Sequence, residues 1–322
     1  MQQHTISKLK TAFEKDVYKG LTDYPKHISS KYFYDKAGDQ LFQDIMEMPE
    51  YYLTRCEFRL LETNAQDICR QFSQQGKPFN LIELGAGDGK KTKILLKELL
   101  QQQADFQYLP IDISGNVLGQ LQTSVRNELP AVDIQPMEGT YFEVLEKLQE
   151  VKNRKVILFL GSNIGNLLHS RAIEFLKGIR RLIGPEDLLF IGFDQKKDPQ
   201  TILDAYNDPT GITEAFNKNI LVRMNRELDG NFNPDNFKHW EAYDPETGTA
   251  RSFLVSKIKQ SVYLEKIDLR ITFDAWESIH TEISQKYDHR TVEWLADEAG
   301  LATGQVFEDP EGCYKNYIFR KK

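Results

Sequence analysis

The feature that most constrains the fold is the stretch from residue 79 to 92, which reads FNLIELGAGDGKKT. Its apolar residues at 79–84 predict a buried strand, and apolar residues at helical spacing over 92–100 predict a helix. Between them lie three glycines, which let the backbone turn sharply and approach a ligand without hindrance from Cβ atoms: Gly85, Gly87 and Gly89. This order is typical of the first βα turn of a doubly wound sheet, where nucleotide-like cofactors bind.

The spacing of the glycines restricts the kind of cofactor. The dinucleotide fingerprint G-x-G-x-x-G would need glycine at position 90, where the chain has Lys90. The P-loop spacing G-x-x-x-x-G-K-[ST] is absent as well. What remains is an acid before the turn, Glu83, followed by G-x-G-x-G, a pattern of S-adenosylmethionine (SAM) methyltransferases. A glycine turn with a purely structural role in another α/β protein stays open as the alternative.

A second strand signal supports a cofactor site. Residues 106–112 form an apolar run that ends on Asp112, about 20 to 30 residues after the glycine turn, where a ribose-binding acid sits in such folds. A carboxylate can accept hydrogen bonds from both ribose hydroxyls, and SAM carries no phosphate to repel it. Asp112 could instead cap the following helix, but Ser114 can fill that role, so we favour the cofactor role.

Composition and cysteine spacing narrow the class of protein. The 322 residues suffice for a sizeable core, and the net charge of -7 comes without a long basic run, which disfavours nucleic acid and anionic membranes as partners. No run approaches the roughly 18 apolar residues of a membrane span, and no apolar signal segment begins the chain. The three cysteines, Cys56, Cys69 and Cys313, lack the spacing of metal ligands or of a disulfide framework. We therefore expect a cytoplasmic protein without a metal site.

Strand and helix signals alternate up to about residue 195, which predicts an α/β fold with a parallel sheet. The further expected elements are a helix within 31–48 ended by Pro49, a helix continuing from Glu57, a third strand at 133–137 leading to 139–142, a fourth at 155–160, a helix at 172–183 and a fifth strand at 187–193. The loop at 161–166 follows the fourth strand, on the sheet edge where ligands bind.

The pattern changes after Lys196. Helix signals at 198–206 and 211–228 are followed by a loop at 229–234. From Arg251 the apolar residues recur with period two, which predicts antiparallel strands. The last expected elements are a helix at 289–299 and a strand at 317–319.

Motifs in order along nearly the whole chain resemble those of one family. They are Y-F-Y-D at 32–35, P-E-Y-Y-x-T-R at 49–55, E-L-G-x-G at 83–87 with Lys91 and Thr92, P-I-D-I-S at 110–114, L-G-S-N-I-G-N at 160–166, K-D-P at 197–199, A-Y-N-D at 205–208, A-F-N-K-N at 215–219, N-R-E-L at 225–228 and T-E-I-S at 281–284. By these motifs the chain resembles the SAM-dependent histidine Nα-methyltransferases of ergothioneine biosynthesis.

The resemblance implies a fold of two domains and a reaction. A Rossmann-like SAM methyltransferase sheet would comprise residues 61–196 with 287–322, and a second, α+β substrate-binding domain would comprise 1–60 with 197–286. The cofactor would be SAM, and the substrate a small molecule bound between the domains. The expected activity is transfer of methyl groups to the α-nitrogen of L-histidine, up to the trimethyl product hercynine, by a monomeric enzyme.

The resemblance also assigns roles to single residues. On the cofactor side the matching residues are Gly85, Gly87, Lys91 and Asp112, with Tyr141 near the adenine. The substrate carboxylate would be held by Asn166 and Tyr206, and the amine would lie near Tyr34, our candidate to accept its proton. The imidazole would lie against Tyr51, with its nitrogens bonded by Glu282 and Ser284, which share one strand face.

Two departures from the family pattern leave the substrate more open than the reaction. The chain has Gly139-Thr-Tyr where bacterial members often have Gly-Asp-Phe, and Ser252 where a methionine can face the imidazole. Another amino acid or small amine is therefore the alternative substrate, and a non-catalytic SAM-binding protein is a third possibility. Two site residues keep structural alternatives: Glu282 as an outward-facing strand residue and Asn166 as a helix cap.

Overall fold

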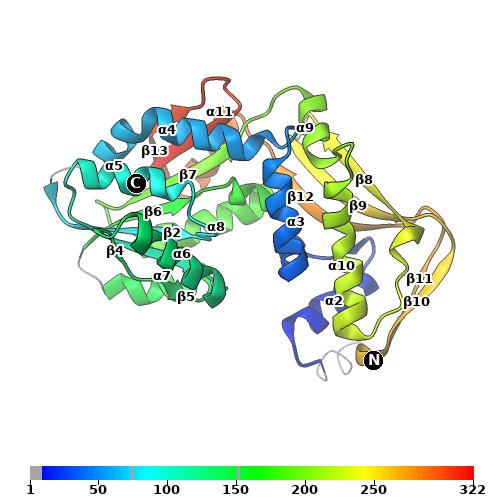
Figure 1. The fold of residues 1–322 in the computed structure, drawn as a ribbon. Helices are drawn as coiled ribbons and strands as arrows, with labels where there is room; N and C mark the ends of the chain where they lie inside the picture. The colour runs from blue at the N-terminus through cyan, green and yellow to red at the C-terminus, as the bar shows by residue number, and fades with distance from the viewer. Residues whose placement is uncertain (1–8, 74–75, 151–152) are drawn as a thin grey trace. The chain divides into compact units, whose positions relative to one another are not determined.

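The computed structural model describes residues 9–73, 76–150 and 153–322 (Figure 1). The chain divides into two compact units, which we call unit 1 (Met1–Tyr52 with Lys197–Ser284) and unit 2 (Leu53–Lys196 with Gln285–Lys322). Within the described ranges, no helix combines the length and apolar character that a membrane crossing requires. The first residues, where we expected no signal segment, lie outside the described part of the chain.

Unit 2 contains a mixed, mainly parallel sheet. Its strands are β2 (Phe79–Leu84), β3 (Phe106–Asp112), β4 (Asp133–Ile134), β5 (Met137–Glu138), β6 (Arg154–Phe159), β7 (Leu188–Asp194), β13 (Leu301–Glu308) and β14 (Tyr314–Lys321). The order across the sheet is β13-β14-β7-β6-β2-β3-β4, with β5 paired to β3. Strands β2, β3, β6 and β7 pair in parallel, while β14 is antiparallel to β7 and β13 antiparallel to β14. The expected α/β, Rossmann-like sheet is confirmed.

This strand order creates a topological switch point. From β2 the chain continues to β3 on one side, and it later returns through β6 on the other side of β2. Every residue of β2 is buried, as its apolar run predicts for a central strand. Ligands of open α/β sheets bind at the carboxyl ends of the strands beside such a point. The loops after Leu84 and Phe159 therefore frame the expected cofactor edge.

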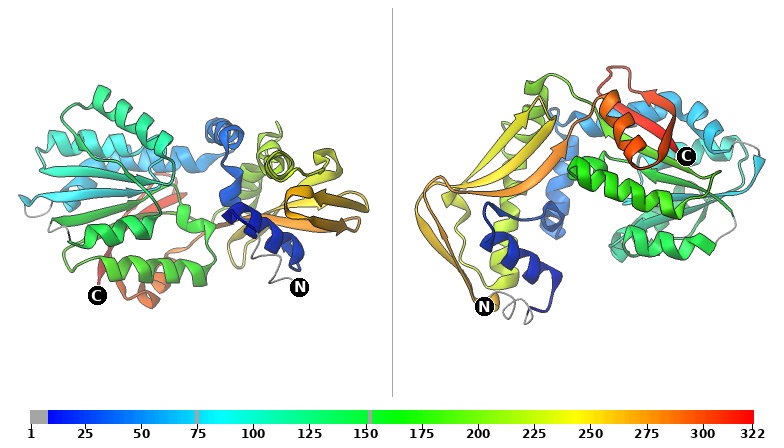
Figure 2. Two further views of the ribbon diagram at one scale, coloured as in Figure 1. Left: turned by 90° about the horizontal axis from the view of Figure 1, so that it is seen from below. Right: turned by 180° about the vertical axis from the view of Figure 1, so that it is seen from behind.

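Helices lie on both faces of the unit 2 sheet (Figure 2). They are α4 (Tyr52–Phe72), α5 (Thr92–Gln101), α6 (Gly115–Glu128), α7 (Tyr141–Lys147), α8 (His169–Leu182) and α11 (His289–Glu298). On one face, buried residues of α7, α8 and α11 form a continuous apolar core with the strands, including Leu145, Leu176 and Leu295. On the other face α4 packs on the sheet, with the rings of Phe72 and Phe190 5.3 Å apart.

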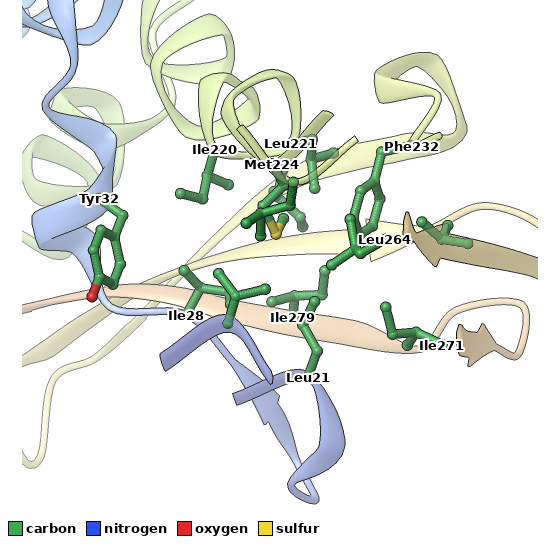
Figure 3. Packing of buried hydrophobic residues seen from close by; sticks show 14 of the residues in the cluster. Leu21, Ile28, Tyr32, Ile220, Leu221, Met224, Phe232, Leu264, Ile271 and Ile279 are labelled. Atoms are coloured by element: carbon green, nitrogen blue, oxygen red, sulfur yellow. The ribbon is translucent and has the colours of Figure 1, made fainter. Parts of the chain in front are cut away.

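Unit 1 combines helices with strands. Its elements are α2 (Ala12–Thr22), β1 (Lys26–His27), α3 (Lys36–Glu47), α9 (Pro199–Tyr206), α10 (Ile212–Leu228), β8 (Phe237–Asp244), β9 (Thr249–Ser256), β10 (Gln260–Leu264), β11 (Leu269–Phe273) and β12 (Ser278–Gln285). The sheet order is β1-β12-β9-β8, and β10 pairs with β11. Strands β8 and β9 pair antiparallel, as do β10 and β11, while β1 pairs with β12 in parallel. Figure 3 shows part of the core, to which Leu221 and Met224 of α10 and Ile279 of β12 all belong.

Short 3₁₀ helices connect several of these elements. They are η1 (Ser30–Phe33), η3 (Leu148–Glu150), η4 (Asn163–Asn166), η5 (Pro234–Asn236) and η6 (Glu265–Ile267). The loop expected after the fourth strand thus contains η4. Its preceding residue, Ser162, has a φ of 54°, in the left-handed region.

Several predicted elements needed correction. The helix expected from Glu57 begins at Tyr52 and continues to Phe72. The expected third strand is two short strands interrupted at Pro136, because proline cannot donate to the ladder. Residues from Tyr141 onward form α7 instead of continuing that strand. Strands β8 and β13 were not predicted. Which unit binds the substrate stays a prediction.

Candidate functional site

The glycine turn after β2 has the conformation that its sequence predicts. Gly85, Gly87 and Gly89 have φ values of 71°, 53° and 67°, which L side chains rarely adopt. A Cβ atom on Gly85 would lie 2.7 Å from the Tyr141 hydroxyl oxygen, and one on Gly89 would lie 2.3 Å from a methyl carbon of Leu121. The turn therefore keeps its backbone open to a ligand only with glycine at these positions.

Glu83 stabilises the glycine turn from the protein interior. Its carboxylate is buried and accepts hydrogen bonds from the Thr92 hydroxyl at the start of α5 and from the Tyr108 hydroxyl of β3. Burial raises the pKa of Glu83 to about 7. The acid of the sequence motif thus ties β2, β3 and α5 together, and its side chain supports the site from inside the fold.

Asp112 ends β3 at the same edge of the sheet. One carboxylate oxygen accepts the Ser114 backbone N–H at 3.0 Å, and the Ser114 hydroxyl accepts the Val117 N–H at 3.3 Å as N-cap of α6. The prediction that Ser114 caps the helix is confirmed. Burial, with the Asp112 carboxylate adding to it, raises the pKa of Tyr141 to about 12. The Tyr141 hydroxyl lies beside Gly85, whose N–H donates to the carbonyl oxygen of Ile111, the residue before Asp112, at 2.9 Å.

Lys91 is fixed by a carboxylate that the sequence did not suggest. Its Nζ donates a hydrogen bond of 2.6 Å to Oε2 of Glu57, a fully buried residue of α4. The same oxygen accepts the backbone N–H of Gly161 at 2.8 Å. The loops after β2 and β6 are thus joined through one side chain.

Asn166 ends η4 and is exposed. The alternative that it caps the next helix is wrong, because α8 begins at His169 with Leu168 in the N-cap position. In the same loop Asn163 donates to the carbonyl oxygen of Leu160 at 3.0 Å, and its amide nitrogen would lie 3.8 Å from a Cβ on Gly85. Asn163 is therefore the side chain of this loop that the structure brings next to the glycine turn.

The expected substrate residues of unit 1 lie near one another. The Tyr206 hydroxyl and the Ser284 hydroxyl are hydrogen-bonded at 2.7 Å. The ring of Tyr51 meets that of Tyr206 edge-on, with centroids 6.3 Å apart. Glu282 and Ser284 are both partly buried on β12. The structure thus joins Tyr206, expected at the substrate carboxylate, to Ser284, expected at its imidazole.

Tyr34 belongs to the same group of unit 1. Its ring lies 5.5 Å from that of Phe42 and 5.6 Å from that of Phe216. Burial raises the pKa of the Tyr34 hydroxyl well above its usual value, and the charge of Glu282 raises it further, followed by Tyr51 and Tyr206. The residue as a whole exposes 42% of its surface, so part of Tyr34 is accessible to solvent. It stays a neutral phenol at neutral pH.

Comparison with known proteins identifies the family. The family described as histidine-specific, SAM-dependent methyltransferases matches residues 13–321. The chain belongs to this family. It is 35% identical to the histidine N-alpha-methyltransferase of Mycolicibacterium smegmatis, over 94% of this chain and 93% of that protein. It is 33% identical to the protein of the same name from Mycobacterium tuberculosis, over 90% and 92%. It is also 27% identical to ergothioneine biosynthesis protein 1 of Schizosaccharomyces pombe, over 92% of this chain and 39% of that protein.

The enzyme is accordingly a SAM-dependent methyltransferase of the histidine-specific family. Its glycine turn fits the cofactor, because open space lies beside Gly87, where no other atom is within 4 Å of the position that a Cβ would take. The departure at Thr140 has a structural role, since Thr140 and Glu143 form a capping box at the start of α7.

The other departure from the family pattern, Ser252, also forms a hydrogen bond within the protein. Its hydroxyl donates to Glu241 at 2.6 Å, and both residues are buried between β8 and β9. We expected a serine here to leave room or offer a polar contact beside the imidazole. In the structure the hydroxyl donates to Oε2 of Glu241, and its contact with an imidazole stays an expectation.

The cysteines of this methyltransferase are closer in space than their spacing suggested. Sγ of Cys56, Sγ of Cys313 and a carboxylate oxygen of Asp309 lie within 4.8 Å of one another. Asp309, however, accepts the backbone N–H groups of its own turn, and the Arg59 guanidinium lies 3.5 Å from it. Burial raises the pKa of Cys56 to about 12, which keeps its thiol protonated. None of the three cysteines, all of which lie in the described part of the chain, forms a disulfide.

Proposed function

We propose that this enzyme transfers methyl groups from SAM to the α-nitrogen of L-histidine and continues to the trimethyl product, hercynine. The observation that carries the proposal is the grouping of Tyr34, Tyr51 and Tyr206 with Glu282 and Ser284 in unit 1. These side chains offer a carboxylate and hydroxyls to a polar ring beside aromatic faces. The family and the relatives named histidine N-alpha-methyltransferase support the same substrate.

For methyl transfer, the protein chiefly has to position the two reactants and to exclude water from them. SAM supplies an electrophilic methyl group on a sulfonium, so the reaction needs an amine lone pair held in line with it. A free α-amine is mostly protonated at neutral pH, and the site must favour its neutral form. Because the raised pKa keeps Tyr34 protonated, its oxygen would accept a hydrogen bond from the amine, and the departing proton would pass to water.

The proposed roles of the remaining residues follow from their places. Glu282 would accept a hydrogen bond from a ring N–H, and Ser284, bonded to Tyr206, would meet the other ring nitrogen. Tyr206 and Asn166 stay proposed ligands of the substrate carboxylate. On the cofactor side Asp112 would bind the ribose, and Tyr141 would lie against the adenine.

The number and position of the added methyl groups test the proposed reaction. Incubation with SAM and L-histidine should yield a product carrying three methyl groups on the α-nitrogen, because every acceptor up to the dimethyl compound still carries an N–H for Tyr34 in its ammonium form, and only the trimethyl product lacks one. Tandem mass spectrometry would locate the groups. A methyl group on the imidazole would contradict the proposed orientation, and turnover of another amine in preference to histidine would establish the alternative substrate class.

Replacing Asp112 by Ala should weaken SAM binding about tenfold, roughly 1.4 kcal/mol, because two ribose hydroxyls lose a charged acceptor. The measurement is calorimetric titration with SAM. Glu138→Ala, at the end of the neighbouring β5, serves as the control and should leave the affinity unchanged. A folded Asp112→Ala variant with the parent's affinity would remove Asp112 from the cofactor site.

We further propose that the enzyme acts in the cytoplasm as a monomer on this small molecule, without nucleic acid as a partner. Cysteines without a disulfide are consistent with a reducing compartment. Size-exclusion chromatography with light scattering tests the oligomeric state.

A further inference from the structure

Glu57 is a buried charge at the switch point of the unit 2 sheet. It lies on α4 and exposes none of its side chain. Oε2 accepts the Lys91 ammonium at 2.6 Å and the Gly161 N–H at 2.8 Å, while Oε1 accepts the Asn316 amide at 3.4 Å. Lys91 follows β2 and Gly161 follows β6, the two strands that flank the switch point. One carboxylate therefore joins the two loops that frame the cofactor edge.

The sheet is built to admit this carboxylate. A Cβ atom on Gly192 of β7 would lie 2.7 Å from Oε1 of Glu57 and 2.3 Å from the Tyr314 hydroxyl, so any larger residue there would displace the acid. A buried carboxylate is costly unless it is paired and hydrogen-bonded. A position that served only to fasten α4 to the sheet could use apolar contacts, as Phe72 does. The charge at Glu57 therefore calls for a reason beyond packing.

The Lys91 side chain, which is paired with Glu57, offers a functional reason for the buried charge. Among the described residues, the hydrogen bonds of its Nζ end at Glu57 alone, and an ammonium has three N–H donors. The Lys91 side chain is 22% exposed, so its remaining donors are accessible to a ligand. A Cβ atom on Gly161 would lie only 3.7 Å from Nζ, which puts the ammonium against the open backbone of that loop.

We propose that Glu57 is a positioning residue for the cofactor: it holds the Lys91 ammonium and the Gly161 loop so that Lys91 binds the carboxylate of the amino acid part of SAM. The proposal rests on SAM as the cofactor and is independent of the methyl acceptor. Glu57 acts through Lys91 and does not touch the ligand. Without its charge, Lys91 would lose its anchor and spend conformational entropy on each binding event.

Two ligands separate positioning from mere stabilisation. S-adenosylhomocysteine keeps the amino acid carboxylate, while 5′-methylthioadenosine has the same nucleoside and sulfur without it. Calorimetric titrations without histidine measure both affinities, so failure of the proposed histidine methylation would not affect the result. The variants are Glu57→Gln, which keeps an oxygen for the Gly161 N–H, Lys91→Met, and the two combined.

Glu57→Gln and Lys91→Met should each weaken binding of S-adenosylhomocysteine about tenfold, while the affinity for methylthioadenosine stays within about twofold. The double variant should be no weaker than Lys91→Met by more than about twofold, because both changes remove one coupled interaction. Lys93→Met is the matched control: it lies two residues further on, pairs with Glu128 at 2.5 Å and should bind both ligands as the parent does.

Three results would overturn the proposal. One is an equal loss of affinity for both ligands in Glu57→Gln, which would assign Glu57 a structural role alone. Another is a double variant whose loss of binding free energy for S-adenosylhomocysteine equals the sum of the losses in the two single variants. The third is unchanged binding of S-adenosylhomocysteine by Lys91→Met, a result that decides the matter even if Glu57→Gln does not fold.

Discussion

Lys286→Met is expected to lower the free energy of unfolding by about 3–5 kcal/mol, the usual cost of breaking a buried ion pair by removing one partner. Nζ of Lys286 lies 2.8 Å from Oδ2 of Asp194, and both side chains are 0% exposed. Loss of the ammonium would leave the Asp194 carboxylate buried beside an apolar thioether. Asp194 is the last residue of β7, so the destabilising effect would be located at the carboxyl edge of the sheet.

Urea unfolding followed by circular dichroism measures this effect. The double variant Lys286→Met with Asp194→Asn should recover much of the loss, because no uncompensated charge remains. Arg171→Met is the surface control: its ion pair with Glu174 has side chains 72% and 64% exposed, and the change should stay within about 0.5 kcal/mol. A loss below about 1 kcal/mol in Lys286→Met would mean that water or a rearranged partner stabilises the remaining carboxylate.

The cofactor edge could be predicted because its signals are local in sequence. Glycines adopt the left-handed conformation at 85, 87 and 89, an apolar run ends on Asp112, and Ser114 caps the next helix as expected. Each of these features depends on residues within one turn or strand. Their gathering at one edge then follows from the parallel order of the sheet.

Strand β8 was missed because its inward-facing positions are partly polar. His239 and Glu241 are buried while Trp240 between them exposes 52%, so the usual alternation of apolar and polar residues is reversed. The buried His239 ring is satisfied by the Asn217 amide at 2.8 Å and by the Tyr206 carbonyl oxygen at 2.9 Å. These partners come from other elements of unit 1, so the sequence around β8 carries no sign of them.

The role of Glu57 could not be predicted from the sequence, because its partners also come from distant parts of the chain. Its partners Gly161 and Asn316 are 104 and 259 residues away along the chain. A glutamate on a helix with Arg55 and Arg59 close by in the sequence has the pattern of an ordinary surface residue. Only the packing of α4 against the sheet places its carboxylate between the two loops. Site residues that act through distant contacts are therefore the ones that local patterns omit.

Glu282→Ala should lower kcat/KM for histidine about 100-fold, roughly 2.7 kcal/mol, while leaving SAM affinity unchanged. Glu282 is a partly buried carboxylate of β12, and its charge reaches the Tyr34 hydroxyl. An imidazole N–H bonded to a carboxylate is a charge-assisted interaction that alanine cannot replace. Glu282→Gln should retain part of the activity, because its amide oxygen can still accept that hydrogen bond.

The ratio of kcat/KM for histidine over another amino acid tests the role of Glu282 more specifically than kcat/KM for histidine alone. A site that pairs polar ring atoms rejects rings that cannot pair, since its own polar groups would be left unsatisfied. Glu282→Ala should therefore narrow the ratio of kcat/KM for histidine over phenylalanine, because the carboxylate that penalises an apolar ring is gone. Glu277→Gln, whose parent residue forms an ion pair with Lys26 just before β12, is the control and should keep the parent ratio. If Glu282→Ala used histidine as well as the parent does, the imidazole would be recognised by other residues, and another amine would become the better candidate for the substrate.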